Sequence, residues 1–327
     1  MAVYTHLGAE TLAQLIGHYD VGALVSAKGI AEGVSNSNWL IETAGADGSG
    51  SRFILTMYER RIDTNQLPFF LGLLDPLAEK GAPVPRTIHD RSGAAYRVLD
   101  GKAVALIEFL PGVSVDHPTA AQARNVGAAL AQMHLAAADF SLTRENDLDI
   151  ATSRHVLDAC GEDALAGIDP ALPEMRETAA RVEADWPSGL PQSIGHTDLF
   201  PDNVLMLGAR VTGMIDFYFA CREAMAYDLA VTHAAWSFAD SGREYRGDIG
   251  TALVDGYESV RQISPAERAA LSLLAQGACL RFVASRAEDW INTPADALVT
   301  RKDPMDFVRR LSFYENVGES LFSPTPD

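Results

Sequence analysis

The spacing of apolar residues changes its period at Leu110-Pro111-Gly112, and this change limits the possible fold more than any other feature. Before it, short runs rich in β-branched and aromatic residues alternate with glycine-containing turns, a pattern typical of strands. After it, apolar residues recur every three or four positions over long stretches, as in amphipathic helices. The pattern therefore predicts an α+β fold of two lobes: a small, strand-rich lobe over residues 1–110 and a larger, mainly helical lobe over residues 111–327.

The N-terminal lobe is expected to contain an antiparallel sheet. Strand-like runs occur at residues 24–30, 38–43 and 52–58, with a loop over 31–37 and a Gly/Ser-rich turn over 44–51 between them. Strands that follow one another through short turns form an antiparallel meander. Further elements are expected as helices over 7–19 and 67–80, and as strands over 95–99 and 103–109.

The C-terminal lobe is expected to be helical except at one place. A long helix begins at Pro118-Thr119, with Thr119 as its N-cap. A single strand-rich island is predicted at about residues 203–219, and helical periodicity continues on both sides of it.

Charge excludes some classes of partner. The 327 residues include 44 acidic and 26 basic side chains, a formal net charge of −18. Nucleic acids and anionic membranes both require a cationic surface, so neither is an expected partner. The excess lies mainly in residues 111–327, with 32 acidic and 17 basic side chains against 12 and 9 in residues 1–110. We expect a cytoplasmic protein, because the three cysteines show no pairing pattern and the sequence contains neither a signal-peptide pattern nor a long apolar segment.

One short segment carries the clearest chemistry. His196, Asp198 and Asn203 fit the spacing H-x-D-x-x-x-x-N, and Asp216 follows the next short strand. Phosphoryl transfer from a metal nucleotide needs a carboxylate that orients the attacking hydroxyl and accepts its proton, and oxygen ligands for Mg²⁺. We therefore expect Asp198 to be the catalytic base, Asn203 and Asp216 to be metal ligands, and His196 to fix the loop. The alternative is that Asp198 and Asp202 cap turns and that His196 is an ordinary core histidine.

Two other segments are candidates for nucleotide contacts. The first is a loop of small residues: Gly33, Val34, Ser35, Asn36 and Ser37. Such a loop can place backbone N–H groups over phosphates, although small residues also occur in plain turns. The second is the connection from Glu108 to Leu110, which can offer backbone groups to adenine or can be a simple linker. The sequence contains no Walker A motif, which excludes a P-loop enzyme.

These residues resemble the aminoglycoside-phosphotransferase-like kinases, which are relatives of protein kinases. The resemblance rests on residues 33–36, 127–134, 196–203, 215–217 and 227–230. Within this family the homoserine kinases are more similar, with matching stretches at 28–34, 53–56, 67–71, 198–204, 215–221 and 302–304. The resemblance covers essentially the whole chain. It implies a two-lobed, protein-kinase-like fold, the use of ATP and Mg²⁺, and transfer of the γ-phosphate to the side-chain hydroxyl of L-homoserine, a step of the threonine pathway.

The chain departs from the kinase pattern at the third strand. Most kinases of this type carry there a lysine that contacts the α- and β-phosphates, whereas the corresponding residue is Thr56. We expect a nearby basic group to replace it. Lys28 lies just before the small-residue loop, and Arg60 and Arg61 lie just beyond the third strand.

Homoserine is a zwitterion, so its site should offer a cation to the carboxylate and an acid to the ammonium group. The candidates are Arg281 and Arg286 for the carboxylate, Asp202, Glu288 and Asp289 for the ammonium group, and Tyr218 and Trp290 for the walls. Arg286 and Asp289 are three residues apart on one predicted helix, which is also the spacing of a surface salt bridge.

Two competing hypotheses remain. The first is a kinase of the same fold that acts on another small alcohol: an aminoglycoside, choline, methylthioribose or an amino alcohol. The second is a catalytically inactive, kinase-like nucleotide-binding module. The presence of Asp198, Asn203 and Asp216 together argues against the second hypothesis, because a degenerate site would usually have lost one of them.

Overall fold

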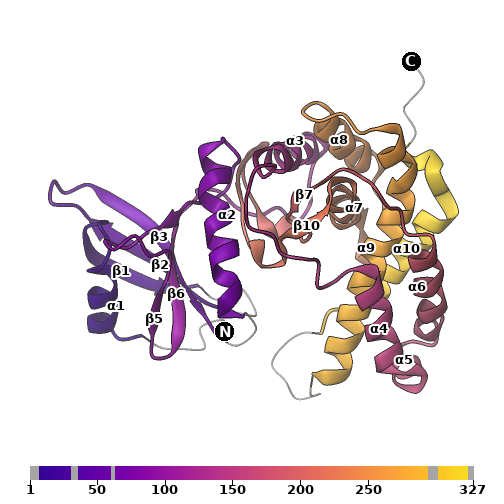
Figure 1. The fold of residues 1–327 in the computed structure, drawn as a ribbon, viewed down its shortest axis with the longest axis horizontal. Helices are drawn as coiled ribbons and strands as arrows, with labels where there is room; N and C mark the ends of the chain where they lie inside the picture. Colours follow the sequence, from indigo (N-terminus) through magenta and orange to yellow (C-terminus); the bar gives the residue numbers. More distant parts are fainter. Residues whose placement is uncertain (1–6, 31–35, 60–62, 294–300, 323–327) are drawn as a thin grey trace.

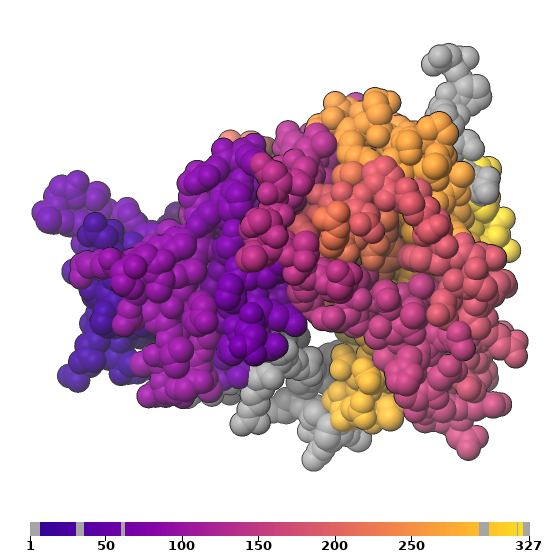
Figure 2. All heavy atoms as spheres, in the orientation of Figure 1, coloured from indigo at the N-terminus to yellow at the C-terminus, as the bar shows by residue number. Residues whose placement is uncertain are grey.

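The computed structural model describes residues 7–30, 36–59, 63–293 and 301–322. They form a small lobe built on a sheet and a larger helical lobe beside it (Figure 1). In the space-filling view the two lobes are in direct contact (Figure 2). Within the described residues, no helix has both the length and the apolar character needed to cross a membrane.

The small lobe contains one antiparallel sheet. Its strands are β1 (Ala23–Gly29), β2 (Asn36–Ala44), β3 (Gly50–Tyr58), β4 (Thr87–Ile88), β5 (Arg97–Leu99) and β6 (Lys102–Glu108). Their order is β1-β2-β3-β6-β4, and β5 pairs with β6. The first three strands form the predicted antiparallel meander. The short strand β4 was not predicted, because two residues are too few to show an alternating pattern.

A helix covers each face of the sheet. Alternate side chains of a strand point to opposite faces. Leu55 and Met57 of β3 therefore pack with α1 (Ala9–Ile16), whereas Tyr58 packs with α2 (Leu67–Glu79) on the other face. In Figure 1, α2 lies between the sheet and the larger lobe.

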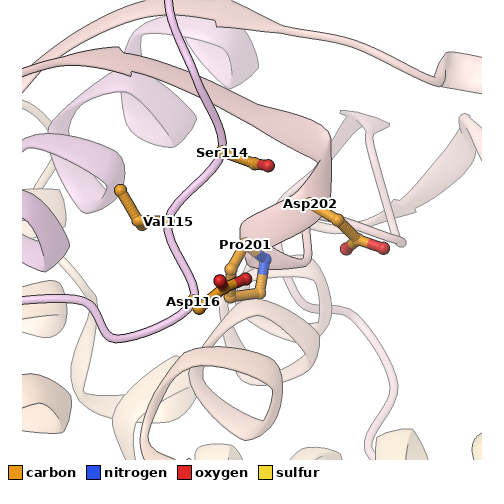
Figure 3. Close-up of a pocket in the computed structure, with 5 residues that line it drawn as sticks. All are labelled: Ser114, Val115, Asp116, Pro201 and Asp202. Carbon is orange, nitrogen blue, oxygen red and sulfur yellow. The ribbon is translucent and has the colours of Figure 1, made fainter. Parts of the chain in front are cut away.

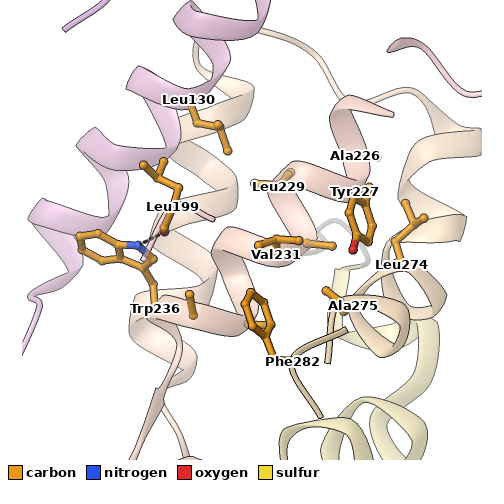
Figure 4. Close-up of a cluster of buried hydrophobic side chains, with 14 of the residues drawn as sticks. Leu130, Leu199, Ala226, Tyr227, Leu229, Val231, Trp236, Leu274, Ala275 and Phe282 are labelled. Carbon is orange, nitrogen blue, oxygen red and sulfur yellow. Dashed lines mark hydrogen bonds between the residues drawn. The ribbon is translucent and has the colours of Figure 1, made fainter. Parts of the chain in front are cut away.

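The larger lobe is built around two buried helices. Its helices are α3 (Ala120–Ala136), α4 (Ile150–Cys160), α5 (Glu162–Ile168), α6 (Met175–Ala184), α7 (Met225–Trp236), α8 (Gly247–Glu258), α9 (Pro265–Asn292) and α10 (Met305–Val317). Every residue of α7 from Ala226 to Trp236 is buried. Side chains of α7 and α9 form the centre of the core, and Trp236 Nε1 donates to the carbonyl of Leu199 (2.8 Å; Figure 4). The helical core is thereby bonded directly to the predicted catalytic loop.

Helix α3 begins as predicted and packs tightly on α8. Thr119 caps it through a reciprocal pair of hydrogen bonds with Gln122. A Cβ atom at Gly127 would lie only 2.0 Å from the carbonyl oxygen of Leu253, so glycine is required where the two helices cross.

The prediction of a single strand-rich island in this lobe was incomplete. The predicted island contains β8 (Val204–Leu207) and β9 (Arg210–Met214), which pair with each other. Two further pairs lie outside it, one of β7 (Gln192–Gly195) with β10 (Cys221–Ala224) and one of β11 (Phe238–Ala239) with β12 (Glu244–Tyr245). The pair of β7 and β10 encloses the island and fixes both ends of the segment that carries the predicted site.

Candidate active site

The predicted catalytic loop connects β7 to β8, and a buried histidine holds it in place. Nδ1 of His196 accepts a hydrogen bond from the backbone N–H of Asp198 (3.3 Å), and Nε2 donates to the carbonyl of Ile215 (2.9 Å). Burial lowers the pKa of His196, which favours the neutral ring that these two bonds require. His196 therefore links the loop to the segment that leads into Asp216.

A buried carboxylate supports the loop from below. Asp228 of α7 accepts hydrogen bonds from the backbone N–H groups of His196 (2.6 Å) and Thr197 (2.7 Å), and from Nε2 of His134 (2.9 Å). Burial alone would raise the pKa of Asp228, but the bonds from His134 and His196 outweigh it, and the pKa is lowered. Gly195 permits this approach, since a Cβ atom there would lie 2.8 Å from Oδ2 of Asp228.

Sequence reasoning assigned no role to Asp228 or His134. A signal was nevertheless present, because an acid within the apolar run 226–231 is rarely buried without a partner. The partners themselves lie on α3 and in the catalytic loop, far away in the sequence.

Thr197 adopts a strained backbone conformation that other groups hold in place. Its φ angle of +56° lies in the left-handed region, which is unusual for a β-branched residue. Its Oγ1 donates to the carbonyl of Phe219 (2.9 Å), its N–H donates to Asp228, and its carbonyl accepts from Arg281. Because Thr197 immediately precedes Asp198, these contacts fix the backbone from which the Asp198 side chain extends.

The Asp198 carboxylate combines partial burial with excess negative charge. Its side chain is 18% exposed, and Nη2 of Arg281 lies 3.9 Å from its Oδ1. The pKa of Asp198 is raised to about 7: burial is the largest cause, Arg281 opposes it, and the neighbouring carboxylates of Asp216 and Asp202 add to it. A partly exposed carboxyl group with a pKa near neutrality is suited to accept a proton from a hydroxyl.

Asn203 and Asp216 are brought together by the β8–β9 hairpin. The carbonyl of Asn203 accepts from the N–H of Ile215 (3.0 Å), and Nδ2 of Asn203 donates to the carbonyl of Asp198 (2.8 Å). Asp216 is accessible, yet the surrounding protein removes enough hydration to raise its pKa to about 6, with a further contribution from Asp202. Among the described residues, none donates a hydrogen bond to the Asp216 carboxylate.

This donor set fits Mg²⁺. The metal prefers oxygen ligands and keeps several waters, so a carboxylate and an amide oxygen, completed by phosphate oxygens, are sufficient. Across the described ranges, no group of three or more His, Cys, Asp and Glu residues is arranged to hold a metal ion. In such a site the protein would supply only a few of the ligands, and phosphate oxygens and water would supply the rest.

A cavity of about 300 Å³ lies next to the catalytic loop, between it and the segment that enters the larger lobe. Its lining residues are Ser114, Val115, Asp116, Pro201 and Asp202 (Figure 3). The two carboxylates make this cavity acidic, and Asp202 is four residues beyond Asp198.

The two arginines expected to bind the acceptor carboxylate have partners within the protein, which argues against that role. Arg281 is 3% exposed and binds the catalytic loop, so its guanidinium group cannot face a ligand. Nη1 of Arg286 donates to the carbonyl of Asp303 (2.9 Å) and pairs with Asp306 (3.1 Å). The surface pair between Arg286 and Asp289 is not formed, because Arg286 points toward α10.

The remaining acceptor candidates are dispersed. Asp289 and Glu288 are exposed near the end of α9, and burial, with a smaller contribution from Glu288, raises the pKa of the Cys160 thiol of α4. Trp290 is half-buried beneath the guanidinium of Arg301, 5.4 Å from its ring centre. Tyr218 contacts the small lobe, with its hydroxyl 3.2 Å from that of Tyr58. Asp202 alone of these candidates lies beside the catalytic loop.

The nucleotide-loop prediction is only partly within the described structure. Gly33, Val34 and Ser35 lie outside the described residues, as do Arg60 and Arg61. Asn36 and Ser37 belong to β2 rather than to a loop, and both are buried. Ser37 Oγ donates to Glu59 (2.6 Å).

The sheet surface next to the cleft carries the other nucleotide candidates. Thr56, at the position where a lysine was expected, donates to Oδ1 of Asn38 (2.8 Å). Lys28 is exposed on β1, opposite Leu40 of β2. The N–H of Glu108 donates to a carbonyl of the neighbouring Arg86 (2.9 Å), so it is not available to a nucleotide.

Comparisons with known proteins extend over the whole chain. A family model described as "Phosphotransferase enzyme family" matches residues 26–263. A homoserine kinase of Gluconobacter oxydans is 47% identical over 97% of this chain and 99% of its own length. A homoserine kinase of Xanthobacter autotrophicus is 45% identical over 98% of each chain.

Solved structures agree on the fold. The structure of amicoumacin kinase hAmiN in complex with AMP-PNP, Ca²⁺ and Ami superposes with a TM-score of 0.67 at 12% identity, covering 98% of this chain and 96% of that one. The predicted two-lobed, kinase-like fold is thereby confirmed. With the family match and the near full-length identities, the chain belongs to the phosphotransferase enzyme family and, within it, to the group of homoserine kinases.

Proposed function

We propose that this protein is an ATP-dependent homoserine kinase, which transfers the γ-phosphate of ATP to the side-chain hydroxyl of L-homoserine and releases O-phospho-L-homoserine and ADP. The near full-length identity to homoserine kinases carries this proposal. The geometry of the site supports it, because Asp198, Asn203 and Asp216 lie together at the cleft as phosphoryl transfer requires.

Asp198 is proposed as the catalytic base. Its carboxylate is exposed enough to meet the acceptor hydroxyl, and the bonds around Thr197 hold it in one direction. As the hydroxyl oxygen attacks the γ-phosphorus, the bond from that phosphorus to the bridging oxygen of ADP breaks, and the hydroxyl proton passes to Asp198. Arg281 offsets the negative charge of the carboxylate and, from its buried position, keeps the base in place.

Asn203 and Asp216 are proposed to hold Mg²⁺. When bound, the ion neutralises phosphate charge and aligns the γ-phosphate with the acceptor. Asn203 Nδ2 is held by the carbonyl of Asp198, which directs its amide oxygen away from the loop. Asp216 has a left-handed backbone, with φ of +68°, and its side chain is exposed and therefore accessible to a metal ion.

The nucleotide is proposed to lie against the small lobe. Glu108 is the last residue of β6, and its N–H is already bonded to Arg86, so we assign the donor to adenine to the N–H of Leu110. We retain the segment 33–37 and Lys28 as contacts of the phosphates. Lys28 has no ion pair with any described residue, and it lies on the strand that leads to this segment.

The test is a comparison of hydroxyl substrates with ATP and Mg²⁺. ADP release is measured for L-homoserine, 3-aminopropanol, choline and an aminoglycoside, and the phosphorylated product is identified by ³¹P NMR and mass spectrometry. We expect the highest kcat/KM with L-homoserine. Higher activity with another alcohol would refute the substrate but not the reaction. Nucleotide binding without any ADP release would instead support an inactive module.

A further inference from the structure

The structure leaves the carboxylate of the proposed acceptor without either of its predicted arginine partners. Arg281 is buried against Thr197 and Asp198, and Arg286 is bound to Asp303 and Asp306. A zwitterionic amino acid bound with its hydroxyl at Asp198 still requires a cation within reach of its carboxylate.

Lys302 is placed to supply that cation. It is exposed, and it forms no ion pair with any residue of the described ranges. The residue that follows it, Asp303, is fixed by three contacts: its carbonyl accepts from Arg286 (2.9 Å), its Oδ1 accepts from the N–H of Met305 (2.9 Å), and it pairs with Arg309 (3.8 Å). The backbone at Lys302 is therefore held while its side chain remains available to a ligand.

The anchor of this segment lies close to the catalytic base. Arg281 and Arg286 are five residues apart on α9, which corresponds to about 7.5 Å along the helix axis. Arg281 contacts Asp198, and Arg286 holds Asp303, so α9 links the backbone next to Lys302 to the base. In agreement, the Lys302 ammonium lowers the pKa values of both Asp198 and Asp216.

An exposed charge of the opposite sign acts on the same two carboxylates. Asp202 lines the cavity beside the catalytic loop and raises the pKa values of Asp198 and Asp216 (Figure 3). One accessible cation and one accessible anion therefore flank the proposed base. Neither is held in an ion pair by a described residue, so both charges are available to a ligand.

We propose that Lys302 and Asp202 together recognise the α-amino acid part of the acceptor, with Lys302 binding its carboxylate and Asp202 its ammonium group. The proposal rests on the proposed function and specifies how the site selects an amino acid over a simple amino alcohol. The alternative position for the Lys302 ammonium, against the γ-phosphate of ATP, is an outcome that the experiment separates.

The experiment compares two variants on acceptors that lack one charged group each. 3-Aminopropanol is homoserine without its carboxylate, and 4-hydroxybutanoate is homoserine without its ammonium group. KM and kcat are measured for Lys302→Gln, Lys302→Arg and Asp202→Asn; where an analogue is not turned over, its inhibition constant against homoserine is measured instead. Lys80→Gln is the matched control, because Lys80 is a surface residue paired with Asp139.

Lys302→Gln is expected to raise KM for L-homoserine roughly 10- to 100-fold, the effect of losing one charge-assisted hydrogen bond. KM for ATP and the binding of 3-aminopropanol should not change, and Lys302→Arg should restore most of the loss. Asp202→Asn should weaken binding of L-homoserine and 3-aminopropanol but not of 4-hydroxybutanoate. Lys80→Gln should have no effect on any of these quantities.

Three results would overturn the proposal: an unchanged KM for L-homoserine in Lys302→Gln, an equal loss for 3-aminopropanol, or a loss confined to ATP, which would assign Lys302 to the phosphates. Failure of the wild-type protein to phosphorylate L-homoserine at all is a different result. It refutes the proposed function and removes the basis of this inference with it.

Discussion

Replacing Asp228 with asparagine tests whether one buried carboxylate holds the catalytic loop. Its Oδ2 accepts from the backbone N–H of His196 and from His134, and its Oδ1 accepts from the N–H of Thr197. Asparagine has the same shape but only one oxygen. The better orientation keeps that oxygen at the Oδ2 position and places the amide NH₂ group against the N–H of Thr197, so one bond is lost and two donors face each other.

The magnitude follows from these three bonds. Leaving one buried N–H without an acceptor costs about 1–3 kcal/mol, and replacing a charged acceptor with a neutral one weakens the two remaining bonds, for a total of about 2–4 kcal/mol. With an unfolding entropy of about 2.1 cal/mol/K per residue over 327 residues, the thermal midpoint should fall by roughly 3–6 °C. The variant should therefore remain folded at assay temperature.

The decrease in kcat of Asp228→Asn should be larger than its modest loss of thermal stability alone would cause. Thr197 keeps its strained backbone only while its neighbours hold it, and it immediately precedes Asp198. We expect kcat of Asp228→Asn to decrease at least tenfold, while KM for ATP changes little. Asp90→Asn is the control, because Asp90 is also buried and hydrogen-bonded but lies in the small lobe; this variant should lower the thermal midpoint without changing kcat. A thermal midpoint within 1 °C of wild type together with normal kcat in Asp228→Asn would refute the reasoning.

Three further predictions address the site directly. Asp198→Asn should lower kcat by about three orders of magnitude with little change in ATP affinity measured by calorimetry, and near-normal turnover would exclude Asp198 as the base. The pKa of Asp198, raised to about 7, means that between about pH 4 and pH 7 the folded protein binds more protons than the unfolded chain. Stability of the nucleotide-free protein should therefore fall as pH rises through this range, by on the order of 3 kcal/mol, and Asp198→Asn should flatten that pH dependence in thermal melts. Lys28→Ala should raise KM for ATP several-fold and leave KM for homoserine unchanged; unchanged ATP affinity would remove Lys28 from the phosphate contacts.

The elements that could be predicted from the sequence are those whose determinants are local. Asn203 and Asp216 are thirteen residues apart, and a strand–turn–strand pattern between them is enough to predict that they meet. The meander of β1, β2 and β3 was predictable for the same reason, because each strand is seven to nine residues long and its partner follows at once. Short turns set the pairing before any distant contact has formed.

Elements that depend on distant partners could not be predicted. Strands β7 and β10 have four residues each, too few for a recognisable alternation, and 25 residues separate the end of one from the start of the other. The cations expected to bind the carboxylate of the acceptor also could not be identified from the sequence, for the same reason. Arg286 was a candidate because the acceptor carboxylate needs a cation from the helical lobe, but α10 supplies Asp306, which pairs with Arg286 instead. The role proposed for Lys302 depends on the pairing of Arg286 with Asp306, which the sequence does not reveal.

Buried charges are an intermediate case, because the sequence reveals that they are buried but not which group they contact. Leu271, Leu274, Ala278 and Arg281 follow one another at intervals of three or four residues along α9, and all are buried. Helical periodicity alone therefore places Arg281 on the apolar face, where a guanidinium group needs a partner within the protein and is poorly placed to bind a soluble substrate. The same reasoning marks Asp228 within the apolar helix α7. Both charges prove to bind Thr197, Asp228 at its N–H and Arg281 at its carbonyl, so the core of the larger lobe helps to orient the proposed base through two buried charges, in addition to the loop's own His196.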